Sequence, residues 1–295
     1  MRASRRLRVS STCLFAAVAA LTASAGPSGL AGCTPPAKTQ TLVGSQESWC
    51  PEGFEQGPDD ACFALPEQRG DKTAVLIYMH HAYSGAGPSS EWDVVKRATE
   101  KGFAVVLVRG RRALCDLPGN PPGAEFCWPR DPDDTTTMKQ MAAGWDKTIW
   151  QADALLEQGP HKHYVLGYGA GGAFAGTLAT QGFLEASGYA MIGAGASMPV
   201  PVAGRKAPLV IVMASDGDGE GAAQAKSTSE ALDKAGWSHA RCPHAQKSLS
   251  KEDLDVVLKT FQRERAGELA SFPSSGAKST QCDPPGTAAP APKKK

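Results

Sequence analysis

Residues 165–176 read VLGYGAGGAFAG, and this stretch constrains the fold more than any other part of the chain. An apolar run ends in glycines at 167, 169, 171 and 172, and a run of small residues follows. Glycines two residues apart are typical of a tight turn between a strand and a helix, where a Cβ atom would clash. The small residues predict a helix that packs closely against the strand. The stretch therefore predicts a strand–turn–helix unit buried in a domain that alternates strands and helices.

Apolar segments alternate with amphipathic segments along most of the chain. We expect buried strands at 73–79, 103–108, 163–166, 189–192, 208–213 and 238–241. We expect helices at 90–101, at 138–158, from about 171, at 222–235 and from 250. Ser90 with Asp93, and Ser250 with Asp253, have the spacing of N-terminal capping boxes. The alternation predicts an α/β fold, a three-layer sandwich in which helices cover both faces of a mostly parallel sheet.

The turn resembles the nucleophile elbow of the α/β-hydrolase fold superfamily, and the resemblance covers about residues 72–265. It is similar in particular to dienelactone-hydrolase-like and secreted-esterase-like members. Gly167 and Gly171 match the glycines that flank the nucleophile, but Gly169 stands where the family has its serine. Glycine has no group that a base can activate, and it adopts without strain backbone angles that cost other residues about 1–3 kcal/mol. The resemblance therefore implies a complete turn that lacks its nucleophile.

The resemblance also implies where a catalytic acid and base would lie. Asp218 follows an expected strand at the place of the family's acid, and Asp216 is the alternative. His244 lies between the last short strand and the last helix, as the family's histidine does. His239 is the alternative base, although it is expected within the strand. Position 169, the acid and the histidine follow one another in the order that the fold requires.

The loop after the first expected buried strand corresponds to the oxyanion loop of the family. Its residues are His80, His81 and Ala82, and Ala170 would supply the second amide. His80 matches the family's histidine, whereas His81 replaces its glycine. A bulky residue at this turn is expected to disturb an oxyanion hole. Gly169 and His81 are therefore departures at two separate catalytic positions.

These departures favour a pseudoenzyme that serves as a binding or scaffold module for a small acyl or ester-like ligand or for a protein partner. The alternative is an active hydrolase of esters or related acyl compounds with a non-standard nucleophile. Ser84, Ser197 and Ser215 lie near the expected site, but none is on a turn that presents a nucleophile in this fold. Gly169→Ser is predicted to create weak esterase activity if acid and base are still paired. We expect no cofactor and no metal, and the formal net charge of +1 argues against a nucleic-acid partner.

Two other features have two interpretations each. Arg109, Arg111 and Arg112 follow the end of an expected strand, where they either meet an anionic ligand or lie in a solvated loop. The loop 115–127, with Trp128 after it, either roofs the site and offers an aromatic contact or is a stapled surface loop.

Residues 1–33 have the pattern of a bacterial export signal. Arginines precede an apolar run, residues 14–21 (LFAAVAAL), which is too short to span a membrane as a helix. The sequence at 30–33 (LAGC) resembles the bacterial lipobox, in which Cys33 would be lipidated. Cleavage after Ala25 is the alternative, and it would yield a soluble secreted or periplasmic protein. We expect an exported protein that a lipid anchor holds at the membrane of the bacterial cell envelope.

The cysteines suit an oxidising compartment. The chain has eight, of which Cys13 leaves with the signal and Cys33 would carry lipid. Pairing the six others by closeness along the chain, and the last two by elimination, predicts the disulfides Cys50–Cys62, Cys115–Cys127 and Cys242–Cys282.

Composition divides the rest of the chain. Residues 34–71 are expected to form a tether followed by a loop-rich segment that the first disulfide closes. The α/β-hydrolase-like domain is expected at 72–265. Residues 266–295 would be a C-terminal extension that ends in a disordered, Pro/Ala-rich tail.

Overall fold

The computed structural model describes residues 49–58, 60–85, 87–116, 122–131, 134–156, 161–196, 209–214, 220–237, 239–244, 248–268 and 280–281. All of them belong to one compact unit, Glu47–Lys295. The predicted export signal, with Cys13, its lipobox and Cys33, lies outside this part of the chain. So do Ser197, Ser215, Asp216, Asp218 and Cys282, which were named above.

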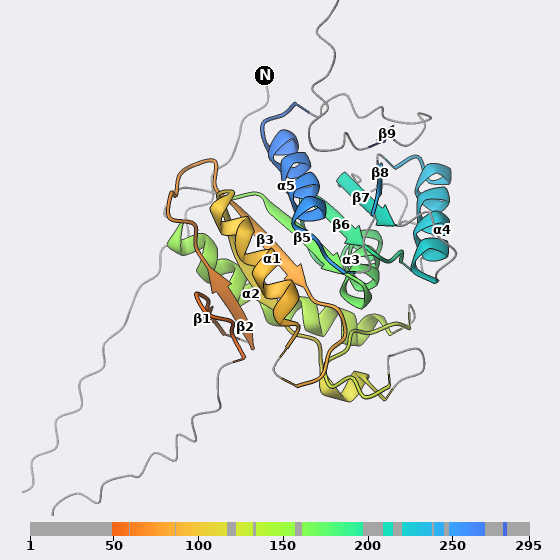
Figure 1. Cartoon of the computed structure of the whole chain (residues 1–295), viewed down its shortest axis with the longest axis horizontal. Coiled ribbons are helices and arrows are strands. Elements are labelled where there is room, and N and C mark those ends of the chain that lie inside the picture. Colours follow the sequence, from red (N-terminus) through yellow and green to blue (C-terminus); the bar gives the residue numbers. More distant parts are fainter. Residues whose placement is uncertain are drawn as a thin grey trace, which may run out of the picture. The chain divides into compact units, whose positions relative to one another are not determined.

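Within the described part, nine strands form one sheet in the order β1-β2-β4-β3-β5-β6-β7-β8-β9 (Figure 1). The strands are β1 (Glu55–Gln56), β2 (Ala61–Ala64), β3 (Ala74–Met79), β4 (Phe103–Val108), β5 (His163–Tyr168), β6 (Gly188–Ile192), β7 (Leu209–Ala214), β8 (His239–Pro243) and β9 (Thr280–Gln281). All neighbours from β4 to β9 pair in parallel, whereas β2 is antiparallel to both β1 and β4. The predicted, mostly parallel sheet is confirmed.

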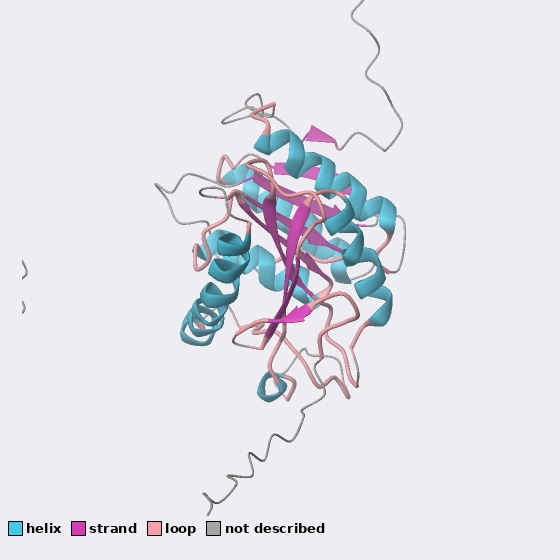
Figure 2. Ribbon diagram, turned by 90° about the vertical axis from the view of Figure 1, so that its left-hand side faces the viewer, coloured by secondary structure: helices cyan, strands magenta, loops and turns pink. Residues whose placement is uncertain are grey.

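Helices cover both faces of the sheet, as predicted (Figure 2). They are α1 (Ser89–Glu100), α2 (Thr135–Leu155), α3 (Ala170–Gln181), α4 (Glu220–Lys234) and α5 (Lys251–Arg265), with a short 3-10 helix, η1 (Arg112–Leu114). Helices α1 and α5 pack on one face, and α2, α3 and α4 pack on the other. Among the described residues, no helix is both long enough and apolar enough to cross a membrane.

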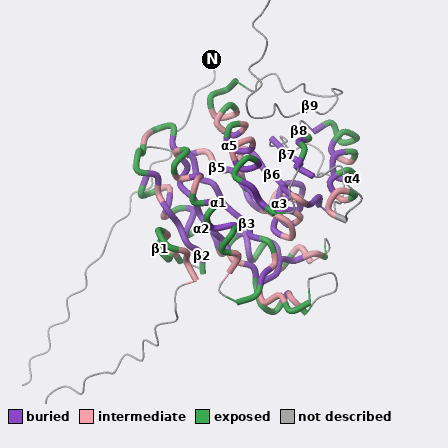
Figure 3. Tube along the Cα trace, viewed as in Figure 1, coloured by how far each residue is buried: buried purple, intermediate pink, exposed green. Residues whose placement is uncertain are grey.

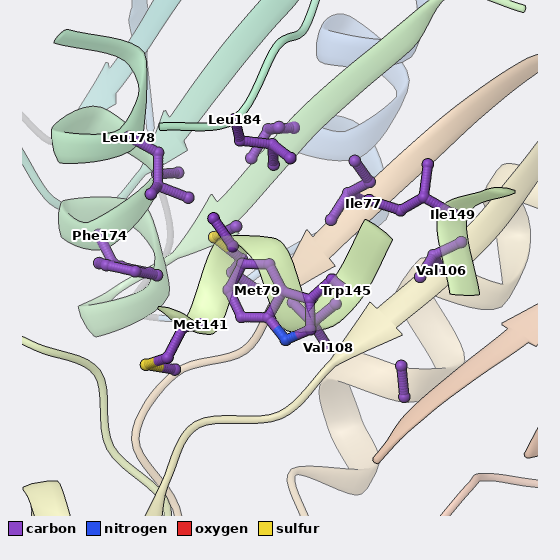
Figure 4. Close-up of a cluster of buried hydrophobic side chains, with 14 of the residues drawn as sticks. Ile77, Met79, Val106, Val108, Met141, Trp145, Ile149, Phe174, Leu178 and Leu184 are labelled. Atoms are coloured by element: carbon purple, nitrogen blue, oxygen red, sulfur yellow. The ribbon is translucent and has the colours of Figure 1, made fainter. Parts of the chain in front are cut away.

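Side chains on the two faces of each central strand pack into two separate hydrophobic cores. Along β3, Ile77 and Met79 point toward α2 and α3, where they meet Trp145 and Phe174 (Figure 4). Leu76 and its alternate neighbours point to α1 and α5. The central strands are therefore buried along almost their whole length, which explains why they read as continuous apolar runs (Figure 3).

One of the two predicted capping boxes is confirmed. Ser250 caps α5, accepting from the backbone N–H of Asp253, whose carboxylate in turn accepts from the N–H of Ser250. The prediction for α1 is wrong, because this helix begins at Ser89 with Pro88 as its N-cap and without a side-chain cap. Ser90 therefore lies inside the first turn, where its side chain cannot cap the helix.

The sheet extends beyond the domain limits expected from the sequence. The segment expected to be loop-rich contributes β1 and β2, and the C-terminal extension contributes β9. The residues of β2 are buried against β4, but a run of four residues is too short to show a periodic pattern.

Two of the predicted disulfides are confirmed, Cys50–Cys62 and Cys115–Cys127. Cys242 is also disulfide-bonded. It follows Arg241, which pairs with Gln281 in the β8–β9 register, and the predicted partner Cys282 comes directly after Gln281 in the sequence. This third pairing stays a prediction, because Cys282 lies outside the described residues.

Candidate functional site

The site predicted from the sequence lies where adjacent parallel strands send their helices to opposite faces of the sheet. Strands β3 and β5 are hydrogen-bonded neighbours, and α1 follows β3 on one face while α3 follows β5 on the other. Ligand sites of open α/β sheets lie at the carboxyl ends of such strands. His80 and His81 follow β3, and Gly169 follows β5, so the fold brings these residues together.

The turn between β5 and α3 consists of one residue, Gly169, with φ +53° and ψ −120°. A Cβ atom on Gly167 would lie 2.2 Å from the carbonyl oxygen of Gly171, and one on Gly171 would lie 2.3 Å from the carbonyl oxygen of Met79. Neither position can hold a larger residue without moving backbone. The predicted strand–turn–helix unit is confirmed, and its glycines lie where backbone segments meet.

The imidazole of His81 fills the space above Gly169. A Cβ atom on residue 169 would lie 2.2 Å from Nδ1 of His81. The same Nδ1 accepts a hydrogen bond of 3.1 Å from the backbone N–H of Ala170, the amide expected to line an oxyanion hole. Because Nδ1 is the acceptor, the neutral ring carries its proton on Nε2. The ring of His81 thus fills the place of a nucleophile side chain and also accepts the hydrogen bond of the Ala170 amide beside it.

Interactions on both sides hold His81 in this position. Its backbone N–H donates to Oε2 of Glu91, 3.2 Å away, and its ring contacts the ring of Tyr168 with centroids 5.7 Å apart. Partial desolvation and the nearby charge of Arg130 lower the pKa of His81. Burial raises the pKa of Glu91 to about 7, although the hydrogen bonds from Tyr78 and His81 oppose this shift.

His80 is a structural residue of the predicted oxyanion loop. Its Nδ1–H donates to the carbonyl oxygen of His81 at 2.6 Å, and its Nε2 accepts from the N–H of Gly110 at 3.0 Å. Burial lowers the pKa of His80 to about 3, so the ring stays neutral. Ala82, the third residue of the loop, is half-buried against the α2/α3 core.

Trp128 lies in the interior and does not line a surface. It is fully buried, donates from Nε1 to the carbonyl oxygen of His80 at 2.7 Å, and stacks on Phe174 of α3 with centroids 5.3 Å apart. The interpretation of Trp128 as an aromatic contact for a ligand is therefore wrong. Its contacts fix the loop after β3 against α3, the helix that follows the turn.

His244 lies after β8, as predicted, and is paired with a carboxylate. Its Nδ1 contacts Oδ2 of Asp253 at 3.0 Å, and both side chains are buried. Burial alone would raise the pKa of Asp253, but the hydrogen bonds from His244 and Ser250 outweigh it and lower the pKa below its usual range. The predicted acid positions, 216 and 218, lie outside the described residues, and their assignment stays a prediction.

The alternative base does not belong to this group. His239 lies within β8, as expected, and its Nδ1 faces the carbonyl oxygen of Trp237 at 3.3 Å. Among the residues that the structure describes, no three histidines, cysteines or carboxylates are grouped to hold a metal ion.

Two of the three arginines after β4 are held by neighbours. Arg109 contacts Asp60, and its guanidinium lies 4.5 Å from the ring centre of Phe126. Arg112 pairs with Glu125 at 3.0 Å and covers the same ring. These contacts favour the structural interpretation over an anion site.

Two residues of the site were missed in the sequence. Asp253 was assigned only to the helix cap, and no sequence signal shows that its carboxylate also faces His244. Glu91 is a carboxylate in the first turn of α1, next to buried Trp92, and its burial follows only from the fold.

A mostly parallel sheet with helices on both faces, and a one-residue turn at its switch point, define a hydrolase-like α/β class. No protein-family model matches the chain, and no curated protein matches it in sequence. The fold of the chain is similar to that of α/β hydrolases.

Solved structures with similar folds include YahD with malic acid, with a TM-score of 0.50 and 13% identity, over 69% of this chain and 98% of that chain. Esterase PE8 has a TM-score of 0.49 and 16% identity, over 68% and 96%. A carboxylesterase from Mesorhizobium loti has a TM-score of 0.48 and 15% identity, over 68% and 93%. At these identities the likeness concerns the fold alone.

Proposed function

We propose that this protein is a catalytically silent α/β-hydrolase-fold protein that binds an acyl or ester-like ligand, or a protein partner, without turnover. The observation that carries the proposal is the ring of His81 above Gly169. Catalysis at an elbow needs a side chain at that place and a free amide for the oxyanion. Here the side chain is absent, and the Ala170 amide is already bound to His81.

A second candidate function is residual hydrolysis with another nucleophile or an activated water. The pair of His244 and Asp253 favours it, because a histidine held through Nδ1 by a carboxylate keeps Nε2 as a base. Ser250 is not the missing nucleophile, since its hydroxyl donates to Asp253 at 2.6 Å and caps α5. The two candidate functions differ in whether His244 activates a nucleophile or a water molecule.

The purified full chain is expected to show no labelling by a fluorophosphonate probe and no hydrolysis of p-nitrophenyl acetate. Gly169→Ser alone is expected to stay silent, because its side chain would collide with His81. This changes the expectation from the sequence that the single substitution suffices. Gly169→Ser combined with His81→Gly frees both the space and the Ala170 amide, and is expected to gain weak labelling.

His81→Gly alone is the matched control and should not be labelled. Labelling of the double variant should disappear again when His244→Ala is added. Turnover by the unmodified chain that is lost in His244→Ala would instead establish the second candidate and overturn the first.

We also propose that the protein is exported and lipid-anchored at Cys33. Two disulfides support an oxidising compartment. Mass spectrometry of the mature protein isolated from cells is expected to find a lipidated Cys33 as the first residue. A mature chain that starts unmodified at Gly26 would show a secreted or periplasmic form without an anchor.

A further inference from the structure

The contact between His81 and Ala170 exists only when the histidine is neutral. The backbone N–H of Ala170 is a donor that cannot lose its proton, so Nδ1 of His81 must offer a lone pair across the 3.1 Å between them. A proton on Nδ1 would set two donors against each other. The ring is also the group that fills the space above Gly169, since three of its atoms lie within 2.9 Å of a Cβ placed there.

We propose that His81 is a proton-operated cover of the vacant nucleophile turn, closed when neutral and opened by protonation. In the closed state the ring binds the Ala170 amide and fills the space above Gly169. In the open state the ring has moved away from the Ala170 amide and from the space above Gly169. Acidification would thus control access to the turn. The proposal goes beyond the binding function above, and it does not depend on whether the protein turns over any substrate.

Charged and titratable groups face His81 from each element packed around it. Arg130, in the loop after the Cys115–Cys127 disulfide, opposes a positive charge on the ring. His80, which precedes His81 in the loop after β3, is neutral because burial lowers its pKa to about 3. Glu91 of α1 accepts from the backbone N–H of His81.

On the remaining side, the ring of Tyr168 lies between His81 and His244, with centroid distances of 5.7 Å and 6.4 Å. Desolvation and Arg130 both lower the pKa of His81. Opening is therefore expected at a pH below the ordinary titration range of a histidine. Glu91, whose pKa burial raises to about 7, titrates at higher pH.

The exposed side of the ring lets it move. His81 is exposed to solvent, in contrast to the fully buried His80 beside it. Its backbone is held by Glu91 and by His80, whereas its ring is hydrogen-bonded to the backbone amide of Ala170. Rotation of this side chain can therefore break the cover without disturbing the loop.

Nuclear magnetic resonance of the full chain tests the proposal through two signals followed against pH. The first is the ring of His81, whose nitrogen shifts should show an unprotonated Nδ1 at neutral pH. The second is the backbone amide of Ala170. Both are expected to change with one midpoint, below that of a histidine in the unfolded chain. Amide exchange at Ala170 should become about fivefold faster across this step, the change expected for the loss of one hydrogen bond.

Three variants test whether the pH-dependent change at Ala170 is caused by protonation of His81. His81→Asn keeps an acceptor in the place of Nδ1 but does not titrate, so the Ala170 amide should stay protected at all pH values. His81→Ala should leave it unprotected throughout. Glu91→Gln keeps an acceptor for the N–H of His81 without its charge, and should retain the low-pH step.

The proposal fails if the Ala170 signal does not follow the His81 ring, or if it still titrates in His81→Asn. It also fails if the step disappears in Glu91→Gln, which would assign it to Glu91. None of these outcomes depends on esterase assays, so a failure here is distinct from a failure of the proposed function.

Discussion

Gly171→Ala is expected to destabilise the protein by more than about 3 kcal/mol, a large part of the stability of a typical domain. The added Cβ would lie 2.3 Å from the carbonyl oxygen of Met79 and 2.4 Å from that of His80. Both are backbone atoms at the end of β3, so no side-chain rotation relieves the contact. Helix α3 would have to move away from the sheet. Denaturant unfolding followed by circular dichroism measures the loss.

Gly172→Ala is the matched control. It adds the same methyl group to the same helix, and gains the same helix propensity of roughly 1 kcal/mol. Its Cβ would lie 3.1 Å from the carbonyl oxygen of Gly167 and 3.3 Å from that of Ile192, so a shift of a few tenths of an ångström accommodates it. We expect this variant to stay within about 1 kcal/mol of the unmodified chain. Equal stabilities of the two variants would show that α3 does not pack against β3 as closely as described.

The contrast between Gly171 and Gly169 explains what the sequence could predict about the turn. At Gly171 the need for glycine comes from backbone, and the spacing of glycines in VLGYGAGG is a direct consequence. At Gly169 the nearest atoms belong to the side chain of His81. The sequence indicated that Gly169 and His81 both depart from the family. It did not show that one residue fills the space left by the other, because the direction of a loop side chain depends on its three-dimensional neighbours.

The regular elements could be predicted where burial is complete. Strand β4 was predicted with its exact bounds, since both of its faces are covered and every residue is apolar. Strands β1 and β9 have two residues each and carry no pattern. The capping box of α5 was predicted from local spacing, because a cap involves residues three apart. The contact of Asp253 with His244 joins a helix to a loop, and local spacing carries no information on it.

Glu91→Gln is expected to gain stability relative to the unmodified chain as pH rises. Between pH 4.5 and high pH, the difference in the free energy of unfolding should change by about 3 kcal/mol in favour of the variant. Burial raises the pKa of Glu91 from 4.5 to about 7. Between these values the folded chain holds a proton that the unfolded chain has lost. The stability that this proton contributes is fully present below pH 4.5, and it is lost as pH rises through 7. The glutamine keeps an acceptor for Tyr78 and His81 but has no proton to lose.

The measurement is the free energy of unfolding in urea from pH 4.5 to pH 8 for both proteins. His80 acts in the opposite direction, because its lowered pKa removes stability as pH falls below the ordinary histidine range. It is present in both proteins and cancels in their difference. Glu100→Gln, at the exposed end of α1, controls for the loss of a surface carboxylate and should follow the unmodified chain. If Glu91→Gln also runs parallel to the unmodified chain, Glu91 does not titrate as a buried group. The hydrogen bond that the backbone N–H of His81 donates would then be accepted by a carboxylate that is charged at neutral pH.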